Sequence, residues 1–422
     1  MKKTAKALLK FIDESQTAFH VVETIENDLK SKKHQELKED EDWKIEANQK
    51  YYVKRADASI ILFTTPKNFS NKTTYKIIGA HTDSPSLKVK SNPVSSKEGY
   101  QLLNIEIYGG VLLTSWFDKD LNLGGRVYTE NQKGELESHL VRLPYKLRIP
   151  RLAIHMDRGV NQEGFKPNPQ THMFPFMGLG KEADFESILQ KQLKIKDKIM
   201  SWDLYMYDTE PCSLGGMNEE FIYAPRLDNL ASVHASLVAL TESKNSADDI
   251  MMASYFHNEE VGSSSQNGAG SNFQEATLRR INAALGKTES EMYETISKSY
   301  FISADMAHAI HPGYTQVHDV NHKPEMNKGP VIKSNANVRY ASDGLSIAKF
   351  KQWCNAANVP YQYFNISNDM GCGSTIGPMT ASRLGIPTID IGNAMLSMHS
   401  IREMAGTEDH KLIIDVFKEF YK

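Results

Sequence analysis

Residues 75–85 have the sequence YKIIGAHTDSP, in which a short apolar segment ends abruptly in polar residues. The apolar residues of 75–80 predict a buried β-strand, and the Asp-Ser-Pro run after it favours a turn. Binding sites of open α/β sheets lie beyond the carboxyl ends of their strands. His81 and Asp83 therefore become the first candidate functional residues.

The same kind of segment recurs along the chain and indicates the fold class. Further buried strands are predicted at residues 59–64, 250–256, 300–304 and 388–391. An amphipathic helix is predicted near the start of the chain, and another at residues 229–240, where leucine and valine recur at helical spacing. Alternating strands and helices predict an α/β sheet with helices on both faces.

The residue pattern of the sequence is different between residues 91 and 216. Glycine pairs, alternating apolar residues and a proline-rich loop at 166–175 predict a β-rich segment there. We therefore predict one α/β domain, formed by residues 1–90 and 217–422, that is split by an inserted β-rich domain at 91–216.

The amino-acid composition limits which partners and which cellular compartment are expected for the protein. The 422 residues include 40% hydrophobic and 24% charged residues with a formal net charge of −3, which argues against nucleic acid as a main partner. The three cysteines are far apart and form no C-x-x-C pair, so a reducing compartment fits best. No apolar run suits a signal peptide or a membrane span. We expect a cytoplasmic protein that acts on peptides or small molecules.

Acidic and imidazole residues stand at or just beyond the predicted strand ends, and one more stands where a helix begins. They are His81, Asp228, Glu260, Asp305 and His399. Each has an ordinary structural explanation by itself, such as a helix cap for Asp228. Together, two imidazoles and three carboxylates are the ligands that two zinc ions sharing a bridging carboxylate require.

Two acidic positions suggest catalytic and supporting roles. Neighbouring side chains of extended backbone point in opposite directions, so Glu260 could bind metal while Glu259 acts as general base. A pair of solvated surface acids is the alternative. Asp83 could accept the second ring N–H of His81, or it could simply belong to a turn.

The chain resembles a known family of metallopeptidases. The segments GAHTDSPSLKVK, IPRLAIHMDR, APRLDNLASV, NEEVGS and CGSTIGPMTASRLGIPTIDIGNAMLSMHSIREMAG occur in the order found in the aspartyl aminopeptidase family of di-zinc metallopeptidases, which includes vacuolar aminopeptidase I. The resemblance implies a zinc-peptidase core with a mixed sheet sandwiched by helices, interrupted by a β-rich dimerisation domain. It also implies a homododecamer.

The resemblance assigns roles residue by residue. It implies that His81, Asp228 and Asp305 hold one zinc ion, and that Asp228, Glu260 and His399 hold the other, with cobalt or manganese as alternatives in one site. Glu259 matches the general base, Asp83 the carboxylate behind His81, and His155 a histidine that reaches the active site of a neighbouring subunit. Lys333 falls in the segment that lines the substrate pocket.

The expected activity is release of single N-terminal residues from peptides by a hydroxide that bridges the two zinc ions. The resemblance suggests Asp or Glu as the preferred first residue, with Lys333 as counter-charge. The alternatives are a preference for neutral residues, a deacylase or carboxypeptidase on the same core, and an inert oligomeric scaffold. His257 replaces the Asp usual in the family, which could change the pKa of Glu259.

Overall fold

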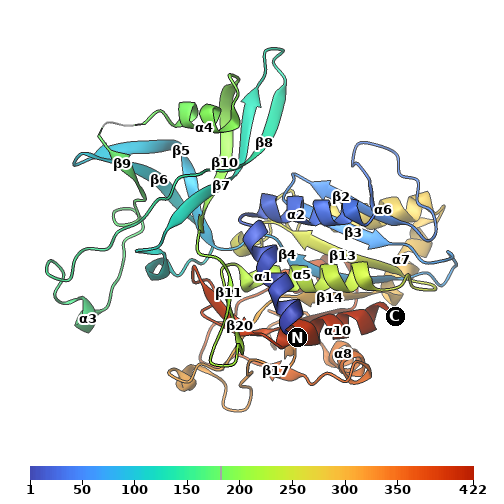
Figure 1. Cartoon of the computed structure of the whole chain (residues 1–422). Helices are drawn as coiled ribbons and strands as arrows, with labels where there is room; N and C mark the ends of the chain where they lie inside the picture. Colours follow the sequence, from blue (N-terminus) through green and yellow to red (C-terminus); the bar gives the residue numbers. More distant parts are fainter. Residues whose placement is uncertain (181–182) are drawn as a thin grey trace.

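The computed structural model describes residues 1–180 and 183–422. Its main element is a nine-stranded mixed sheet (Figure 1). In spatial order its strands are β1 (Gln35–Glu36), β2 (Lys50–Arg55), β3 (Ser59–Thr64), β13 (Ile250–Phe256), β4 (Tyr75–His81), β14 (Tyr300–Ala304), β18 (Thr388–Gly392), β16 (Val331–Lys333) and β17 (Gln362–Phe364). The central strands β13, β4, β14 and β18 run parallel, so their carboxyl ends lie at one edge.

Helices cover both faces of this sheet because its buried strands are apolar on both sides. Ile78 and Ile302 pack on one side, in a core with α1 (Lys2–Glu14), α2 (Ala18–Ser31), α5 (Leu227–Glu242), α8 (Gly344–Ala356) and α10 (Asp409–Tyr421). Ile77 and Phe301 pack on the other side, in a core with α6 (Phe273–Ala284), α7 (Glu289–Lys298) and α9 (Ile376–Leu384). The predicted fold class is confirmed.

A six-stranded antiparallel sheet forms the lobe at the upper left of Figure 1. Its spatial order is β8 (Leu136–Arg142), β7 (Leu121–Glu130), β10 (Lys198–Asp208), β5 (Ser86–Lys97), β6 (Tyr100–Tyr108) and β9 (Phe176–Leu179). The same part of the chain holds the 3-10 turn η1 (Leu113–Trp116), α3 (Val160–Glu163) and α4 (Phe185–Leu193). The sheet packs on its own apolar cluster, which includes Leu103 and Leu204. The division at residues 91 and 217 remains a prediction.

A third, five-stranded sheet was not predicted. Its order is β11 (Ser213–Gly215), β12 (Phe221–Ala224), β20 (Glu403–Gly406), β19 (Ala394–Leu396) and β15 (Ala307–His308). Pairing of β12 with β20 places Ala224 opposite Glu403, which brings the chain just before α5 beside the C-terminal segment. Two further 3-10 turns are η2 (Glu259–Val261) and η3 (Thr315–Val317). Among the described helices, none combines the length and apolarity needed to cross a bilayer.

Candidate metal centre

The five predicted metal ligands lie together at the carboxyl edge of the nine-stranded sheet. His81 ends β4, Glu260 lies in η2 just after β13, and Asp305 follows β14 directly. Because these three strands are parallel neighbours, their ends meet. Asp228 comes from the first turn of α5, and His399 from the loop between β19 and β20.

Two of the possible metal-holding groups consist only of predicted ligands, and both contain Asp228. One group is His81, Asp228 and Asp305, and the other is Asp228, Glu260 and His399. One oxygen of Asp228 lies 3.2 Å from His81 Nε2, and its other oxygen lies 3.5 Å from His399 Nε2. His81 Nε2 is 3.6 Å from Asp305 Oδ1, and His399 Nε2 is 3.4 Å from Glu260 Oε2.

These separations suit zinc. A tetrahedral ion with bonds near 2.0–2.2 Å has ligand atoms about 3.4 Å apart. The buried atoms Asp228 Oδ1, Glu260 Oε1 and Asp305 Oδ1 have no hydrogen-bond partner in the described structure. Unpaired buried carboxylate oxygens are costly, and a pair of divalent cations would satisfy them. The donor set therefore fits two zinc ions.

The pKa shifts of the clustered side chains indicate that the site favours positive charge. Burial raises the pKa of Glu259 to about 8, and the nearby charges of Asp305 and Asp228 add to this effect although His81 opposes it. Burial, together with Asp228, also raises the pKa of Glu260 well above its ordinary value. Burial disfavours the charged form of His81, but its contacts with Asp228, Asp305 and Asp83 outweigh this and raise the pKa of the imidazole. Without cations, the Glu259 and Glu260 carboxyls therefore tend to keep their protons.

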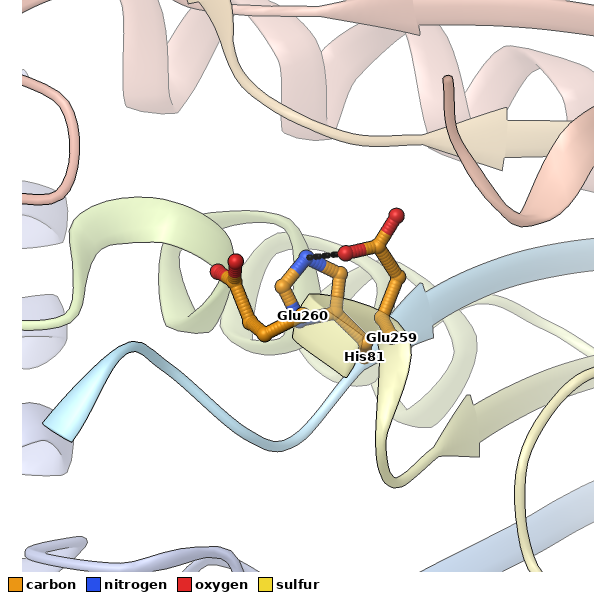
Figure 2. A group of neighbouring side chains, drawn as sticks. All are labelled: His81, Glu259 and Glu260. Atoms are coloured by element: carbon orange, nitrogen blue, oxygen red, sulfur yellow. Dashed lines mark ion pairs between the residues drawn. The ribbon is translucent and has the colours of Figure 1, made fainter. Parts of the chain in front are cut away.

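The side chains of Glu259 and Glu260 point in different directions, but the cause is not the predicted one. They lie in a 3-10 turn that follows Asn258 with φ of 60°, so the premise of extended backbone was wrong. Even so, Figure 2 shows their carboxylates on opposite sides of the His81 ring. Glu259 Oε2 lies 3.9 Å from His81 Nε2. The turn therefore allows the two acids to serve different purposes.

Asp83 holds this turn in place. Its two carboxylate oxygens accept the backbone N–H groups of Glu259 and Glu260, each at 3.2 Å. His81 Nδ1 lies 3.1 Å from the Asp83 backbone oxygen and 3.5 Å from its carboxylate. Burial opposes ionisation of Asp83, but its interaction with His81 keeps the pKa at about 2. Asp83 thus lies where a carboxylate behind His81 is expected.

Glu403 is a site residue that the sequence analysis missed. It is 3% exposed, and its carboxylate accepts the backbone N–H of His399 at 2.8 Å and of Asp228 at 3.1 Å. Burial, aided by the charge of Asp228, raises its pKa to about 8. One side chain therefore fixes the backbone of two candidate ligands. Its place four residues after His399 in the quoted C-terminal motif was the available signal.

Comparison with known proteins identifies the family. The sequence model described as "Aminopeptidase I zinc metalloprotease (M18)" matches residues 11–421. The chain belongs to the M18 peptidase family. It is a zinc metalloaminopeptidase, which confirms the predicted family and enzyme class. A protein of Pseudomonas fluorescens (strain SBW25) named "Probable M18 family aminopeptidase 2" is 42% identical over 426 residues, with 99% of this chain and 97% of that protein covered.

Another "Probable M18 family aminopeptidase 2", from Clostridium acetobutylicum, is 41% identical over 426 residues, covering 99% of this chain and 98% of its own. Among solved structures, Ape4 in the Ape4 and Nbr1 complex gives a TM-score of 0.94 at 37% identity, covering 100% of this chain and 86% of that one. The structure of the S. cerevisiae mApe1 dodecamer gives a TM-score of 0.86 at 27% identity, and the match covers 100% of this chain and 96% of that one. Both solved structures share the fold over the whole length of this chain.

A cleft of about 460 Å³ opens beside the cluster of this M18 aminopeptidase, and Lys333 lies in its wall. Lys333 is 2% exposed, donates to the Met306 carbonyl at 3.1 Å and lies 3.6 Å from Asp305. His155 lies elsewhere. It is exposed in the loop before α3, and it is absent from the described residues that line the cleft.

His257 does not bring a positive charge to the M18 centre. Burial lowers the pKa of its imidazole, so the ring is neutral near pH 7. The ring stacks on Tyr108, with centroids 6.2 Å apart and planes at 15°. The residue that departs from the family pattern therefore acts here as a packed aromatic group rather than as a cation near Glu259.

The raised pKa of Glu259 predicts that the free energy of unfolding of the metal-free M18 protein depends on pH. The folded state keeps this proton up to about pH 8, whereas the unfolded chain releases it near 4.5. Proton binding thus stabilises the fold below pH 4.5, and the contribution falls as pH rises toward 8, by up to about 1.4 kcal/mol per pH unit.

Denaturant unfolding of the metal-free protein between pH 5 and 8 checks this prediction. Relative to Glu259→Gln, the wild-type protein should lose stability as pH rises. The difference between the two proteins isolates Glu259 from buried histidines such as His410, whose lowered pKa acts in the opposite direction. Parallel pH profiles would show that Glu259 carries no such proton.

Proposed function

We propose that this chain removes single N-terminal residues from peptides with the aid of two zinc ions. His81, Asp228 and Asp305 would hold one ion, and Asp228, Glu260 and His399 the other. The observation that carries the proposal is the placement of the two oxygens of Asp228, each facing a different histidine. A carboxylate in that position suits a bridge between two cations.

Two zinc ions in these positions would supply Lewis acidity, which would lower the pKa of a water molecule enough for it to give up a proton and attack a peptide bond near neutral pH. Glu259 would accept the proton of that water and pass it to the leaving amine. Its carboxylate borders the cleft beside His81, where a substrate carbonyl can approach. Asp83 and Glu403 keep the surrounding backbone in place through their accepted N–H bonds.

We infer an acidic first residue as the preferred substrate, with Lys333 as its counter-charge. Among the described residues that line the cleft, Lys333 is the single lysine. A neutral first residue is the second candidate, because Asp305 and the Met306 carbonyl already contact the Lys333 ammonium. Tyr340, Phe364 and Met398 add apolar surface to the same cleft.

A cleavage profile over all first residues, with zinc quantified in the same sample, tests the proposal. Free-amine peptides should be cut one residue at a time, and N-blocked peptides should resist. Metal-free protein should be inactive and should recover with zinc or cobalt. Rapid cleavage of N-blocked peptides would favour a deacylase, and cleavage from the other end would favour a carboxypeptidase. A zinc-loaded but inert protein would favour a scaffold.

Lys333→Met should change selectivity more than turnover. If the ammonium pairs with an acidic first residue, cleavage of Asp- or Glu-initiated peptides should fall about 10- to 100-fold relative to Leu-initiated peptides. The measurement is kcat/KM on matched peptides that differ only in the first residue. Lys298→Met, on the exposed surface of α7, serves as control. An unchanged ratio would favour the neutral-residue alternative.

We further propose that the chain assembles as a homododecamer in the cytoplasm, with residues 91–216 as dimerisation domain and His155 reaching a neighbouring active site. The dodecamer of the related S. cerevisiae mApe1 supports the assembly, and the exposure of His155 in its loop suits a contact with another subunit. Light scattering of the purified protein tests the assembly. A stable, fully active monomer would contradict both the dodecamer and the role of His155.

A further inference from the structure

The end of β6 carries a tyrosine of the six-stranded sheet into contact with the metal centre. Tyr108 is the last residue of β6 and is 9% exposed. Its hydroxyl donates to Asp83 Oδ2 at 2.6 Å and accepts from Asn258 Nδ2 at 2.8 Å. The tyrosine therefore joins two segments of the core, one after β4 and one after β13.

The segments that contain Asp83 and Asn258 both contact or adjoin Glu259 and Glu260. Asp83 accepts the backbone N–H groups of Glu259 and Glu260, and Asn258 precedes these two residues directly. A hydroxyl that fixes Asp83 and Asn258 therefore fixes, through one intermediate group, the turn that carries the proposed base and one proposed ligand. Asn258 has a further restraint, because Ser265 donates to its Oδ1 at 2.8 Å.

The two residues after Tyr108 touch the other half of the cluster. The Gly110 carbonyl lies 3.0 Å from His399 Nδ1, which leaves Nε2 of that ring facing Asp228 and Glu260. A Cβ at Gly110 would lie 3.2 Å from His399 Nδ1, and one at Gly109 would lie 3.1 Å from Glu260 Cβ. Gly109 also has φ of +76°, which glycine adopts without strain. The glycine pair thus lets this backbone pass close to both ligands.

We propose that Tyr108 is a positioning residue of the metal centre, which holds Asp83 and the Glu259–Glu260 turn in the geometry that metal binding and proton transfer require. The inference rests on the proposed two-zinc function and adds a second role for the six-stranded sheet. In this role the sheet supplies, through Tyr108 and the Gly110 carbonyl, outer contacts to both halves of the cluster.

Removal of the hydroxyl would leave the ring in place and free the groups that it holds. In Tyr108→Phe, Asp83 loses its shortest hydrogen bond and the amide of Asn258 loses an acceptor. Loss of such supporting contacts at metal sites lowers metal affinity or activity by about 10- to 100-fold. Because Tyr108 acts through Asp83 and not on a ligand directly, Tyr108→Phe should weaken zinc binding at the lower end of that range, about 10-fold, and lower kcat more than it raises KM.

The test compares Tyr108→Phe with Tyr205→Phe in the full-length protein. The Tyr205 ring packs edge-on against Tyr108 with centroids 5.4 Å apart, and no hydrogen bond of its hydroxyl is found among the described residues. Zinc affinity is measured by competition with a chelator, and site geometry by the visible spectrum of the cobalt-substituted protein. Tyr108→Phe should change both, whereas Tyr205→Phe should match the wild type.

A double-variant cycle with Asp83→Asn tests the route of the effect. Since Tyr108 acts through Asp83, the effects of the two substitutions on zinc affinity should be less than additive. Wild-type affinity in Tyr108→Phe, equal losses in both tyrosine variants, or strict additivity would overturn the positioning role. A wild-type protein that binds fewer than two zinc ions would instead count against the proposed metal centre, so the two failures are distinguishable.

Discussion

Glu259→Gln should lower kcat/KM by about 10²- to 10⁴-fold while the protein keeps both zinc ions. Glutamine has nearly the same shape as glutamate but cannot accept the proton of the attacking water. The backbone N–H of residue 259 would still donate to Asp83, so the turn should remain in place. The five proposed ligands are left intact. Steady-state kinetics and elemental analysis of the same preparation measure the two quantities together.

Glu294→Gln is a suitable control for this variant because it makes the same chemical change on the exposed surface of α7. It should behave as wild type in both measurements. Full turnover in Glu259→Gln would remove Glu259 from the role of base. Loss of zinc from Glu259→Gln would instead make it a ligand, in line with the group that it forms with His81 and Glu260.

The parts of the fold that could be predicted are those governed by local apolar runs. The strands at Ser59–Thr64, Ile250–Phe256 and Tyr300–Ala304 have the predicted bounds, because every residue in them is buried and polar residues at or just beyond their ends stop the apolar run. The convergence of His81, Glu260 and Asp305 then follows from parallel pairing of neighbouring strands. The alternation of strand and helix was enough to suggest that pairing.

The remaining features depend on contacts between distant parts of the chain. Strands β15 and β19 have two and three residues, which is too short for any periodicity, so the third sheet left no local signal. The contact of Glu403 with Asp228 depends on that sheet. The hydroxyl of Tyr108 reaches Asp83 only once the six-stranded sheet packs against the core. The 3-10 turn at Glu259 begins at a left-handed Asn258, which the flanking residues did not indicate.

Asp228→Asn should remove both zinc ions, whereas substitution of a ligand to one ion should remove one. Each oxygen of Asp228 faces a different histidine, so loss of its negative charge weakens both sites at once. Asp305→Asn should affect mainly the site at His81, and Glu260→Gln mainly the site at His399. Since metal chemistry contributes several kcal/mol of transition-state stabilisation, turnover by Asp228→Asn should fall by about 10³-fold or more.

The stoichiometry of zinc in the three variants separates a bridge from an ordinary ligand. Zinc binding stabilises the fold in proportion to the logarithm of its concentration over Kd, so the rise in Tm on adding zinc should be lost in Asp228→Asn and reduced in the other two. Asp248→Asn, at an exposed position, should keep the full response. If Asp228→Asn and Asp305→Asn lost the same single ion, Asp228 would bind one zinc only, and the two ions would not share a carboxylate at this position.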